Sequence, residues 1–162
     1  MQWVVLIAVI VAALDQLTKW FVIRFISADE SRVVISNFFD LVQVQNTGAA
    51  WGILKDYNFV LSAVSILAVL ALYLFRHNFQ LHRLGSRIAF GLIAGGIVGN
   101  LIDRVRVGHV IDFLSFHVGQ YHWPAFNVAD SAICVGVGLY VILSWRGDGQ
   151  HQANPVAGTS QP

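Results

Sequence analysis

Two aspartates, Asp112 and Asp130, lie in apolar surroundings where an ionised carboxylate is costly. Asp112 follows the apolar pair Val110-Ile111, and Asp130 lies at the start of a long apolar segment. An ionisable side chain at the depth of a bilayer marks a functional site by default. The pair therefore points to chemistry that is carried out by two carboxylates.

Peptide hydrolysis by two carboxylates requires one ionised group and one protonated group. The ionised group takes a proton from water, while the protonated group donates to the oxygen of the scissile carbonyl. Two carboxylates held close together cannot both ionise cheaply, so they share one proton. The titration belongs to the pair, and the sequence does not distinguish the base from the acid.

The composition indicates a small integral membrane protein. The chain has 162 residues, of which 56% are hydrophobic and only 12% are charged, and its mean hydropathy is +0.64. A net charge of +1 offers no electrostatic attraction to nucleic acid. The single cysteine, Cys134, excludes an internal disulfide, and its apolar neighbours predict a buried side chain.

Four segments approach the length of about 20 apolar residues that crosses a bilayer. They are residues 3–26, 57–75, 88–102 and 126–145. The predicted fold is therefore an all-α membrane protein with four transmembrane helices. Residues 1–146 form one integral-membrane catalytic domain in this interpretation. The tail, residues 147–162, is rich in Gly, Gln, Pro and Ser, which predicts disorder.

Alternation of the four spans gathers the polar residues at one membrane face. The C-terminal ends of the first and third spans and the N-terminal end of the fourth must lie on the same side. The connection that holds Asp112 opens on that side too. The polar residues that these three ends carry are Asp15, Lys19, Asn100, Asp103, Arg104, Asn127 and Asp130.

Three charged residues on these ends admit more than one interpretation. Asp15 and Lys19 are four residues apart on one helical face, so they can form a structural ion pair or take part in the chemistry directly. Arg104 could neutralise a carboxylate, bind a substrate carbonyl, or extend to the membrane surface. For Asp15 and Lys19, structural pairing is favoured over direct chemistry. A charged pair inside a span needs neighbours that hydrate it or form hydrogen bonds with it, which predicts a polar pocket nearby.

Gly91, Gly95 and Gly99 recur at four-residue spacing in the third span. Small residues at this spacing allow close approach of helices in a membrane. Helix packing is the favoured interpretation, and a ligand groove beside the glycines is the alternative.

The two connections on the polar side predict a small extramembrane sheet that rests on the bilayer. Residues 41–45 alternate with a period of two, which is typical of a half-buried strand, and residues 46–48 form a turn signal. In the second connection, residues 104–125, the alternation recurs at residues 104–107, which indicates that this connection also contributes to the sheet.

Charge counting does not orient the molecule in the membrane. Arginines in the connection 76–87 and after the fourth span favour a cytoplasmic location for both termini and for this connection. The opposite connections also hold basic residues, namely Arg32, Lys55, Arg104 and Arg106.

Taken together, five short blocks resemble the bacterial lipoprotein signal peptidase family, signal peptidase II. They appear in the family order and span most of the chain up to about residue 145. The blocks are Asp15-Gln16-Leu17-Thr18-Lys19, Asn46-Thr47-Gly48-Ala49-Ala50, Gly99-Asn100-Leu101-Ile102-Asp103-Arg104, Val110-Ile111-Asp112-Phe113 and Phe126-Asn127-Val128-Ala129-Asp130-Ser131. One block alone is weak evidence, whereas five in order are specific.

The resemblance implies an aspartic endopeptidase in which Asp112 and Asp130 are the catalytic dyad. The family removes signal peptides from prolipoproteins, on the N-terminal side of a cysteine that carries diacylglycerol. It uses no cofactor and no metal, and globomycin-type antibiotics inhibit it. The residues that the resemblance places in or around the substrate site are Asp15, Lys19, Asn46, Gly48, Asn100, Asp103, Arg104 and Asn127.

The resemblance also implies a location. Members lie in the bacterial cytoplasmic (inner) membrane among its lipids, with both termini cytoplasmic and the active site toward the outer leaflet. The small sheet would then lie on the periplasmic side. This topology agrees with the clustering of polar residues at one face.

Two other function classes are weighed against this interpretation. A transporter or channel subunit could use buried carboxylates as a proton relay, but four spans without repeat symmetry, with polar residues in one leaflet, argue against a complete pathway. A metal-dependent membrane hydrolase could use His109, His117 and His122 near Asp112, although their spacing matches no H-E-x-x-H motif. Chelators would inactivate a metal-dependent hydrolase but not an enzyme that uses the carboxylate dyad.

Overall fold

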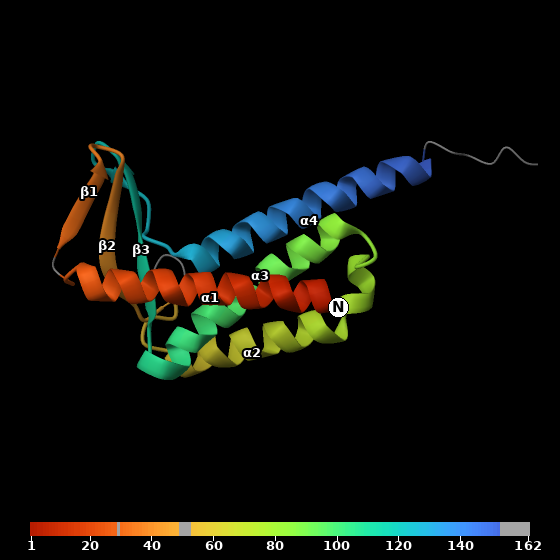
Figure 1. The fold of residues 1–162 in the computed structure, drawn as a ribbon, viewed down its shortest axis with the longest axis horizontal. Coiled ribbons are helices and arrows are strands. Elements are labelled where there is room, and N and C mark those ends of the chain that lie inside the picture. Colours follow the sequence, from red (N-terminus) through yellow and green to blue (C-terminus); the bar gives the residue numbers. More distant parts are fainter. Residues whose placement is uncertain (29, 49–52, 153–162) are drawn as a thin grey trace, which may run out of the picture.

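The computed structural model describes residues 1–28, 30–48 and 53–152, and side chains in the last helix as far as Trp145. Ala49 and Ala50 of the second block, and residues 153–162 of the tail, lie outside this part of the chain. The helices are α1 (Gln2–Phe25), α2 (Asn58–Leu74), η2 (Arg76–Phe79), α3 (Leu84–Val107) and α4 (Val128–Gln152). The strands are β1 (Ser31–Ile35), β2 (Phe39–Asn46), β3 (Val110–Val118) and β4 (Tyr121–His122). The fold is mostly helical, with the sheet at one end of the helices (Figure 1).

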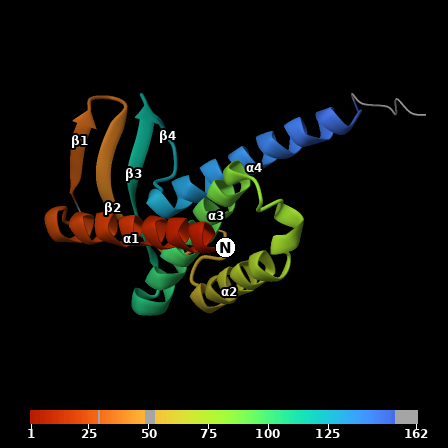
Figure 2. The ribbon, with the colours of Figure 1, turned by 45° about the vertical axis from the view of Figure 1, so that its right-hand side comes forward.

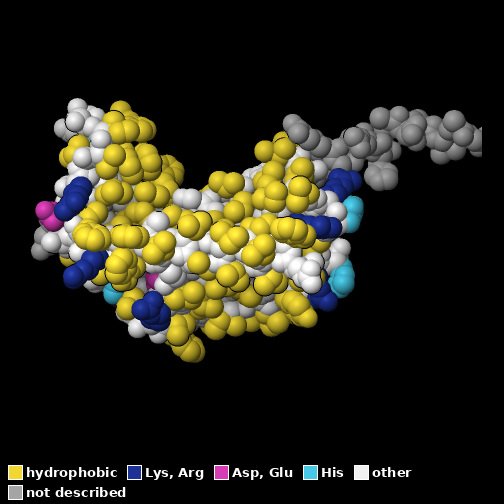
Figure 3. Space-filling view, in the orientation of Figure 1, with side chains coloured by type: hydrophobic (Ala, Val, Ile, Leu, Met, Phe, Trp, Pro, Cys, Tyr) yellow, Lys and Arg dark blue, Asp and Glu magenta, His cyan; other side chains and the backbone are white. Residues whose placement is uncertain are grey.

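Three of the described helices are long and apolar enough to cross a membrane. They are α1, α3 and residues 128–145 of α4, whereas the apolar helix α2 has 17 residues and is shorter. The outward faces of the apolar helices are hydrophobic: Trp3 of α1 and Phe59 of α2, for example, are 60% and 84% exposed. Hydrophobic side chains cover most of the face in Figure 3. This is the surface of a protein whose solvent is lipid rather than water.

α3 is the central helix and packs against α1, α2 and α4 (Figure 2). Gly91, Gly95 and Gly99 all face α1, as the packing interpretation predicted. A Cβ atom added to Gly95 would lie 2.7 Å from the carbonyl oxygen of Ala8, so the two backbones are in direct contact. A Cβ atom added to Gly96 would likewise overlap the backbone of Ala129, so α3 and α4 are also in direct contact.

The sheet is antiparallel, with the strand order β1-β2-β3-β4. β2 confirms the strand predicted from the alternation of residues 41–45. Its register with β3 pairs Val44 with Asp112 and Asn46 with Val110, which brings the end of β2 next to the first aspartate. The sheet packs on the end of α1 through a small apolar core that comprises Val22, Ile26, Ile111 and Phe113.

The second connection does contribute β3 and β4 to the sheet, but the alternation at residues 104–107 does not mark a strand, because these residues are the last turn of α3. Four residues of alternation are too few to distinguish a strand from a helix end. Arg104 and Arg106 are favourable in a last helical turn, where the helix dipole is negative. Gly108 then ends the helix in the left-handed conformation with φ 81°, and the strand begins at Val110 instead.

α4 continues to Gln152, beyond the position after Arg146 where disorder was expected to begin. Residues 147–152 are therefore helical. The first residues of the predicted tail extend the last helix instead of leaving it.

We predict opposite stability effects for two glycine-to-alanine changes. The Cβ of Gly96→Ala would overlap the carbonyl oxygen of Ala129, and backbone cannot move aside cheaply, so we expect a loss of about 1–3 kcal/mol. Gly138→Ala meets nothing within 4 Å and should be neutral or stabilising by up to about 1 kcal/mol. Thermal unfolding in detergent micelles measures both. Equal melting temperatures for the two variants would contradict the close approach of α3 and α4.

Candidate active site

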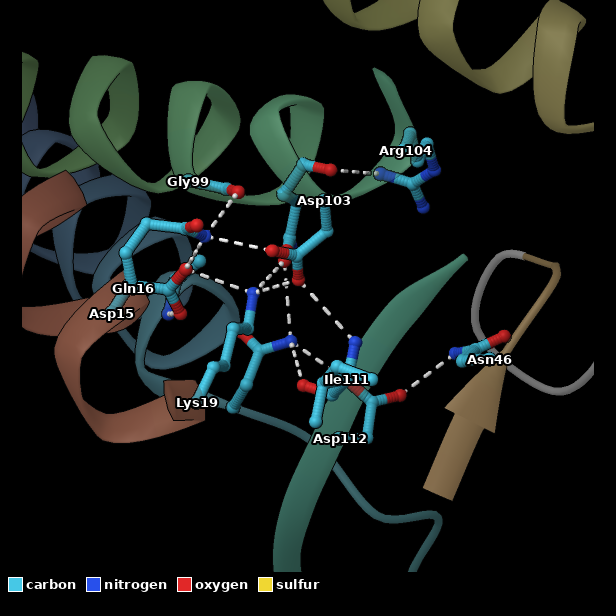
Figure 4. Close-up of polar contacts among 12 residues, drawn as sticks. Asp15, Gln16, Lys19, Asn46, Gly99, Asp103, Arg104, Ile111 and Asp112 are labelled. Carbon is cyan, nitrogen blue, oxygen red and sulfur yellow. Dashed lines mark hydrogen bonds and ion pairs between the residues drawn. The ribbon is translucent and has the colours of Figure 1, made fainter. Parts of the chain in front are cut away.

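A buried lysine lies at the centre of the polar end of the helices. Lys19 is 2% exposed, and its Nζ lies 2.8 Å from Asp15 Oδ2 and 2.7 Å from Asp103 Oδ2 (Figure 4). Nζ also donates to Asn100 Oδ1 at 3.0 Å. An ammonium group has three donors, and all three have a partner here. The predicted pair of Asp15 and Lys19 is thus part of a triad that joins α1 to α3.

The two carboxylates of this triad also hold the backbone immediately before each candidate catalytic residue. Asp15 Oδ1 accepts from the backbone N–H of Ala129 at 2.9 Å, and the next residue is Asp130. Asp103 Oδ2 accepts from the backbone N–H of Ile111 at 3.3 Å, and the next residue is Asp112. The triad therefore positions the start of α4 and the start of β3 against the same two helices.

Gln16 belongs to the same network, although the sequence analysis did not single it out. Its Nε2 donates to Asp103 Oδ1 at 2.7 Å and to the carbonyl oxygen of Gly99 at 3.2 Å. It also lies 3.3 Å from Asp15 Oδ2. The signal was present in the first block, where a carboxamide directly follows Asp15 inside an apolar span.

Asp130 lies in the first turn of α4 and forms a reciprocal cap with Asn127. The backbone N–H of Asp130 donates to Asn127 Oδ1 at 2.9 Å, and the backbone N–H of Asn127 donates to Asp130 Oδ2 at 3.2 Å. A residue pair of this kind satisfies two donors that a helix start leaves unpaired. The remaining oxygen, Asp130 Oδ1, accepts from Asn100 Nδ2 at 2.7 Å. Because Lys19 holds the oxygen of that carboxamide, its nitrogen is directed at Asp130.

Asp112 is held by two carboxamides and is 2% exposed. Asn127 Nδ2 donates to Asp112 Oδ1 at 2.7 Å, and Asn46 Nδ2 donates to Asp112 Oδ2 at 2.8 Å. The side chain of Asn46 is itself fixed, because its Oδ1 accepts from the backbone N–H of Gly48 at 2.9 Å. The fully buried Asn127 therefore contacts both aspartates through one carboxamide.

Burial raises the pKa of Asp112 from 3.8 to about 6. The hydrogen bonds from Asn46 and Asn127 oppose this rise, whereas the negative charge of Asp130 adds to it. Asp112 lies on β3, outside the spanning helices. A carboxyl group with this pKa retains its proton over a pH range in which an ordinary aspartate is ionised.

Asp112 and Asp130 both line a cavity of about 800 Å³ between the sheet and the helices. Arg104 lines it as well, with Nη2 3.4 Å from the carbonyl oxygen of Gly48 and Nη1 3.5 Å from that of Asn100. Arg104 forms no ion pair with a carboxylate in the described part of the chain. Cys134 is exposed and lines the same cavity, so its predicted burial is wrong. An apolar sequence run does not show which of its residues border a cavity.

Two of the histidines that were weighed as metal ligands lie farther along β3 and on β4. His117 Nε2 is 3.2 Å from Asp40 Oδ2, and the His117 ring stacks on His122 with centroids 4.9 Å apart. The described side chains, which belong to residues 1–28, 30–48 and 53–145, contain no group of three His, Cys, Asp or Glu that could hold a metal ion.

The chain resembles known proteins over nearly its whole length. It is 50% identical over 151 residues to the lipoprotein signal peptidase of Syntrophotalea carbinolica, covering 91% of this chain and 94% of that one. It is 49% identical over 146 residues to the lipoprotein signal peptidase of Oleidesulfovibrio alaskensis, covering 87% and 92%. A bacterial membrane enzyme solved by the in meso method has the same fold, with a TM-score of 0.86 and 33% identity, covering 96% of this chain and 95% of that one.

A second solved bacterial membrane enzyme superposes with a TM-score of 0.79 and 35% identity, over 88% of this chain and 92% of the other. The family model described as signal peptidase (SPase) II matches residues 7–146. This match includes every candidate site residue, from the Lys19 triad to the two aspartates on the cavity wall. The chain therefore belongs to the signal peptidase II family.

Proposed function

We propose that Asp112 and Asp130 are the catalytic dyad with which this signal peptidase removes signal peptides from prolipoproteins. The observation that carries the proposal is their common setting. Both carboxylates line one cavity, and the carboxamide of Asn127 contacts both residues. Bond cleavage on the N-terminal side of a diacylglyceryl cysteine follows from family membership.

The dyad would act by general acid–base catalysis. One carboxylate takes a proton from a water molecule as that water attacks the scissile carbonyl, and the other carboxyl group donates its proton to the carbonyl oxygen. The raised pKa of Asp112 supports proton sharing between the two groups. Either member of the pair can serve as the base or as the acid in this scheme.

The surrounding residues would serve two purposes. Three carboxamides, from Asn46, Asn100 and Asn127, orient the dyad without adding charge. The Lys19 triad holds α1, α3, β3 and α4 together around them. Arg104 and Gly48, both on the cavity wall, would bind the substrate peptide.

We further propose that α2 is a fourth transmembrane helix. Its 17 residues correspond to about 25 Å of helix, which is near the lower limit for a bilayer. With four spans, the sheet and the dyad lie on one side of the membrane, and both termini lie on the other. Residues 1–146 would form a single catalytic domain, to which the tail from Gly147 adds no site residue.

We propose a cytoplasmic location for the termini, in the bacterial inner membrane, because the chain belongs to the signal peptidase II family. The connection between α2 and α3, which would lie on the same side as the termini, contains Arg76, Arg83 and Arg87. The connections on the other side also hold basic residues, so the charge count alone does not fix this orientation. The dyad would then face the outer leaflet, where a lipid-modified cysteine keeps its acyl chains in the membrane. Globomycin-type inhibitors would occupy the cavity that holds the dyad.

We expect Asp112→Asn and Asp130→Asn each to reduce cleavage of a diacylglyceryl prolipoprotein by at least on the order of 10²–10⁴. Asparagine retains the shape but can neither accept nor release the catalytic proton. The assay uses purified protein and a lipidated precursor, with gel separation of the products. Glu30→Gln, which removes an exposed carboxylate, is the matched control and should retain full activity. Full activity in either dyad variant would exclude the proposed mechanism.

We expect Asn46→Ala to shift the pH dependence of cleavage to higher pH. Asn46 donates to Asp112 and lowers the pKa of its carboxyl group, so loss of this donor raises that pKa above about 6. The limb of the pH profile that reports Asp112 ionisation should therefore move upward. The control is Gln45→Ala, which removes a neighbouring carboxamide on the same cavity wall. Identical pH limbs in the two variants would contradict the assigned role of Asn46.

Cysteine labelling tests the proposed orientation, in a Cys134→Ala background. A membrane-impermeant maleimide should label Gln120→Cys, between β3 and β4, in intact spheroplasts. It should label His82→Cys, between η2 and α3, only after the membrane is permeabilised. Both positions are exposed, so accessibility reports the membrane side. The reverse pattern would overturn the orientation but leave the dyad assignment intact.

A further inference from the structure

A second, smaller cavity lies between α2 and α3, away from the proposed active site. It has a volume of about 300 Å³. Ala68 and Ala71 of α2 line it together with Ile93 and Ile97 of α3, and Phe79 of η2 also borders it. The two alanines leave short side chains on this face of α2, which creates the groove.

One border of the groove is held in place by aromatic packing. The Phe79 ring packs on Phe90 of α3 with centroids 5.0 Å apart, and on Tyr140 of α4 with centroids 5.1 Å apart. The groove is therefore bordered by a ring that two other helices fix, rather than by a free loop.

The segment from η2 to the first turn of α3 begins next to the groove residue Phe75 and carries three arginines, which we call the arginine connection and define as Arg76, Arg83 and Arg87. Arg76 directly follows Phe75, another residue that lines the groove. None of the three arginines forms an ion pair with a described residue. All nine acidic residues of the chain lie outside residues 57–102. In Figure 3 the dark blue and cyan side chains at the end away from the sheet have no magenta neighbours among the described residues.

Two of these arginines are oriented by backbone carbonyl groups. Arg87 Nε donates to the carbonyl oxygen of Leu81 at 2.6 Å, and Nη2 donates to that of His82 at 3.2 Å. Arg76 Nη1 donates to the carbonyl oxygen of Tyr73 at 2.7 Å, and its guanidinium lies 4.4 Å from the centre of the Tyr73 ring. These contacts neutralise no charge and leave further N–H donors on each guanidinium, which suits a phosphate group.

We propose that this groove binds an anionic phospholipid of the bilayer, with an acyl chain along α2 and α3 and the phosphate at the arginine connection. The groove accounts for the apolar part of such a ligand. The positive charge of the arginine connection, which has no ion-pair partner among the described residues, would bind the negative headgroup and select it over a zwitterionic one. The lipid would fill the space between α2 and α3 and stabilise the shortest of the four helices.

Native mass spectrometry tests the headgroup selectivity. The full-length protein in detergent is mixed with equal amounts of dioleoylphosphatidylglycerol and dioleoylphosphatidylcholine, which share the same acyl chains. We expect the phosphatidylglycerol adduct to predominate on the order of tenfold, and Arg76→Gln/Arg83→Gln to abolish this preference. The matched control, Arg24→Gln/Arg32→Gln, removes two exposed cations near the sheet and should retain it.

A second pair of variants tests the groove itself. Ala71→Phe fills the groove and should lower the amount of phosphatidylglycerol adduct severalfold. Val64→Phe adds an aromatic ring to α2 at a position that does not line the groove, and it should leave the adduct unchanged. Melting temperatures verify that each variant is folded.

Several results would contradict the proposed lipid-binding site. They are equal retention of the two lipids by the unmodified protein, a preference that survives in Arg76→Gln/Arg83→Gln, and unchanged binding in Ala71→Phe. A dimer in the spectra that Ala71→Phe disrupts would assign the groove to a second copy of the chain instead. Prolipoprotein cleavage by Arg76→Gln/Arg83→Gln should persist, because neither residue borders the dyad cavity.

Discussion

The structure depends on one buried positive charge, the ammonium group of Lys19. A charge in a low-dielectric interior is tolerated only when it is paired and fully hydrogen-bonded. Asp15 and Asp103 provide that pairing from α1 and α3, and it is possible only because these helices approach closely. A Cβ atom at Gly99 would lie 2.7 Å from Asp15 Oδ2, so a side chain at this position would displace the carboxylate. The close packing of α1 against α3 is therefore also a requirement for assembly of the site.

Neutral carboxamide groups connect the ammonium group of Lys19 to the two aspartates. Lys19 orients the carboxamide of Asn100, which in turn donates to Asp130. Asn127 then links Asp130 to Asp112. A carboxamide can donate to one carboxylate while its oxygen accepts elsewhere, so it directs a dyad without fixing the protonation state. The proposed chemistry needs that freedom, because the two carboxylates must exchange protons during each cycle.

The two ends of the helices differ in charge as well as in structure. The dyad and the Lys19 triad lie near the sheet, whereas the arginine connection has no acidic neighbour among residues 57–102. The positive charge of the arginine connection is compatible with the proposed orientation but does not fix it, because the sheet side also holds basic residues. The arginine connection also makes its end of the helices attractive to anionic lipid, which the proposed groove between α2 and α3 would exploit.

The sequence by itself determined the membrane class, the glycine face of α3, the strand β2 and the set of polar residues at one end, because these depend on periodicity, spacing and span parity. Local alternation could not assign residues 104–107, where the helix end at Gly108 decided between helix and strand. Only the tertiary structure placed Gln16 in the buried network and Cys134 on the cavity wall. Likewise, only the fold joined Asp15 to Ala129 and Asp103 to Ile111. Such contacts arise from packing between segments that are distant in the sequence, so no local sequence pattern predicts them.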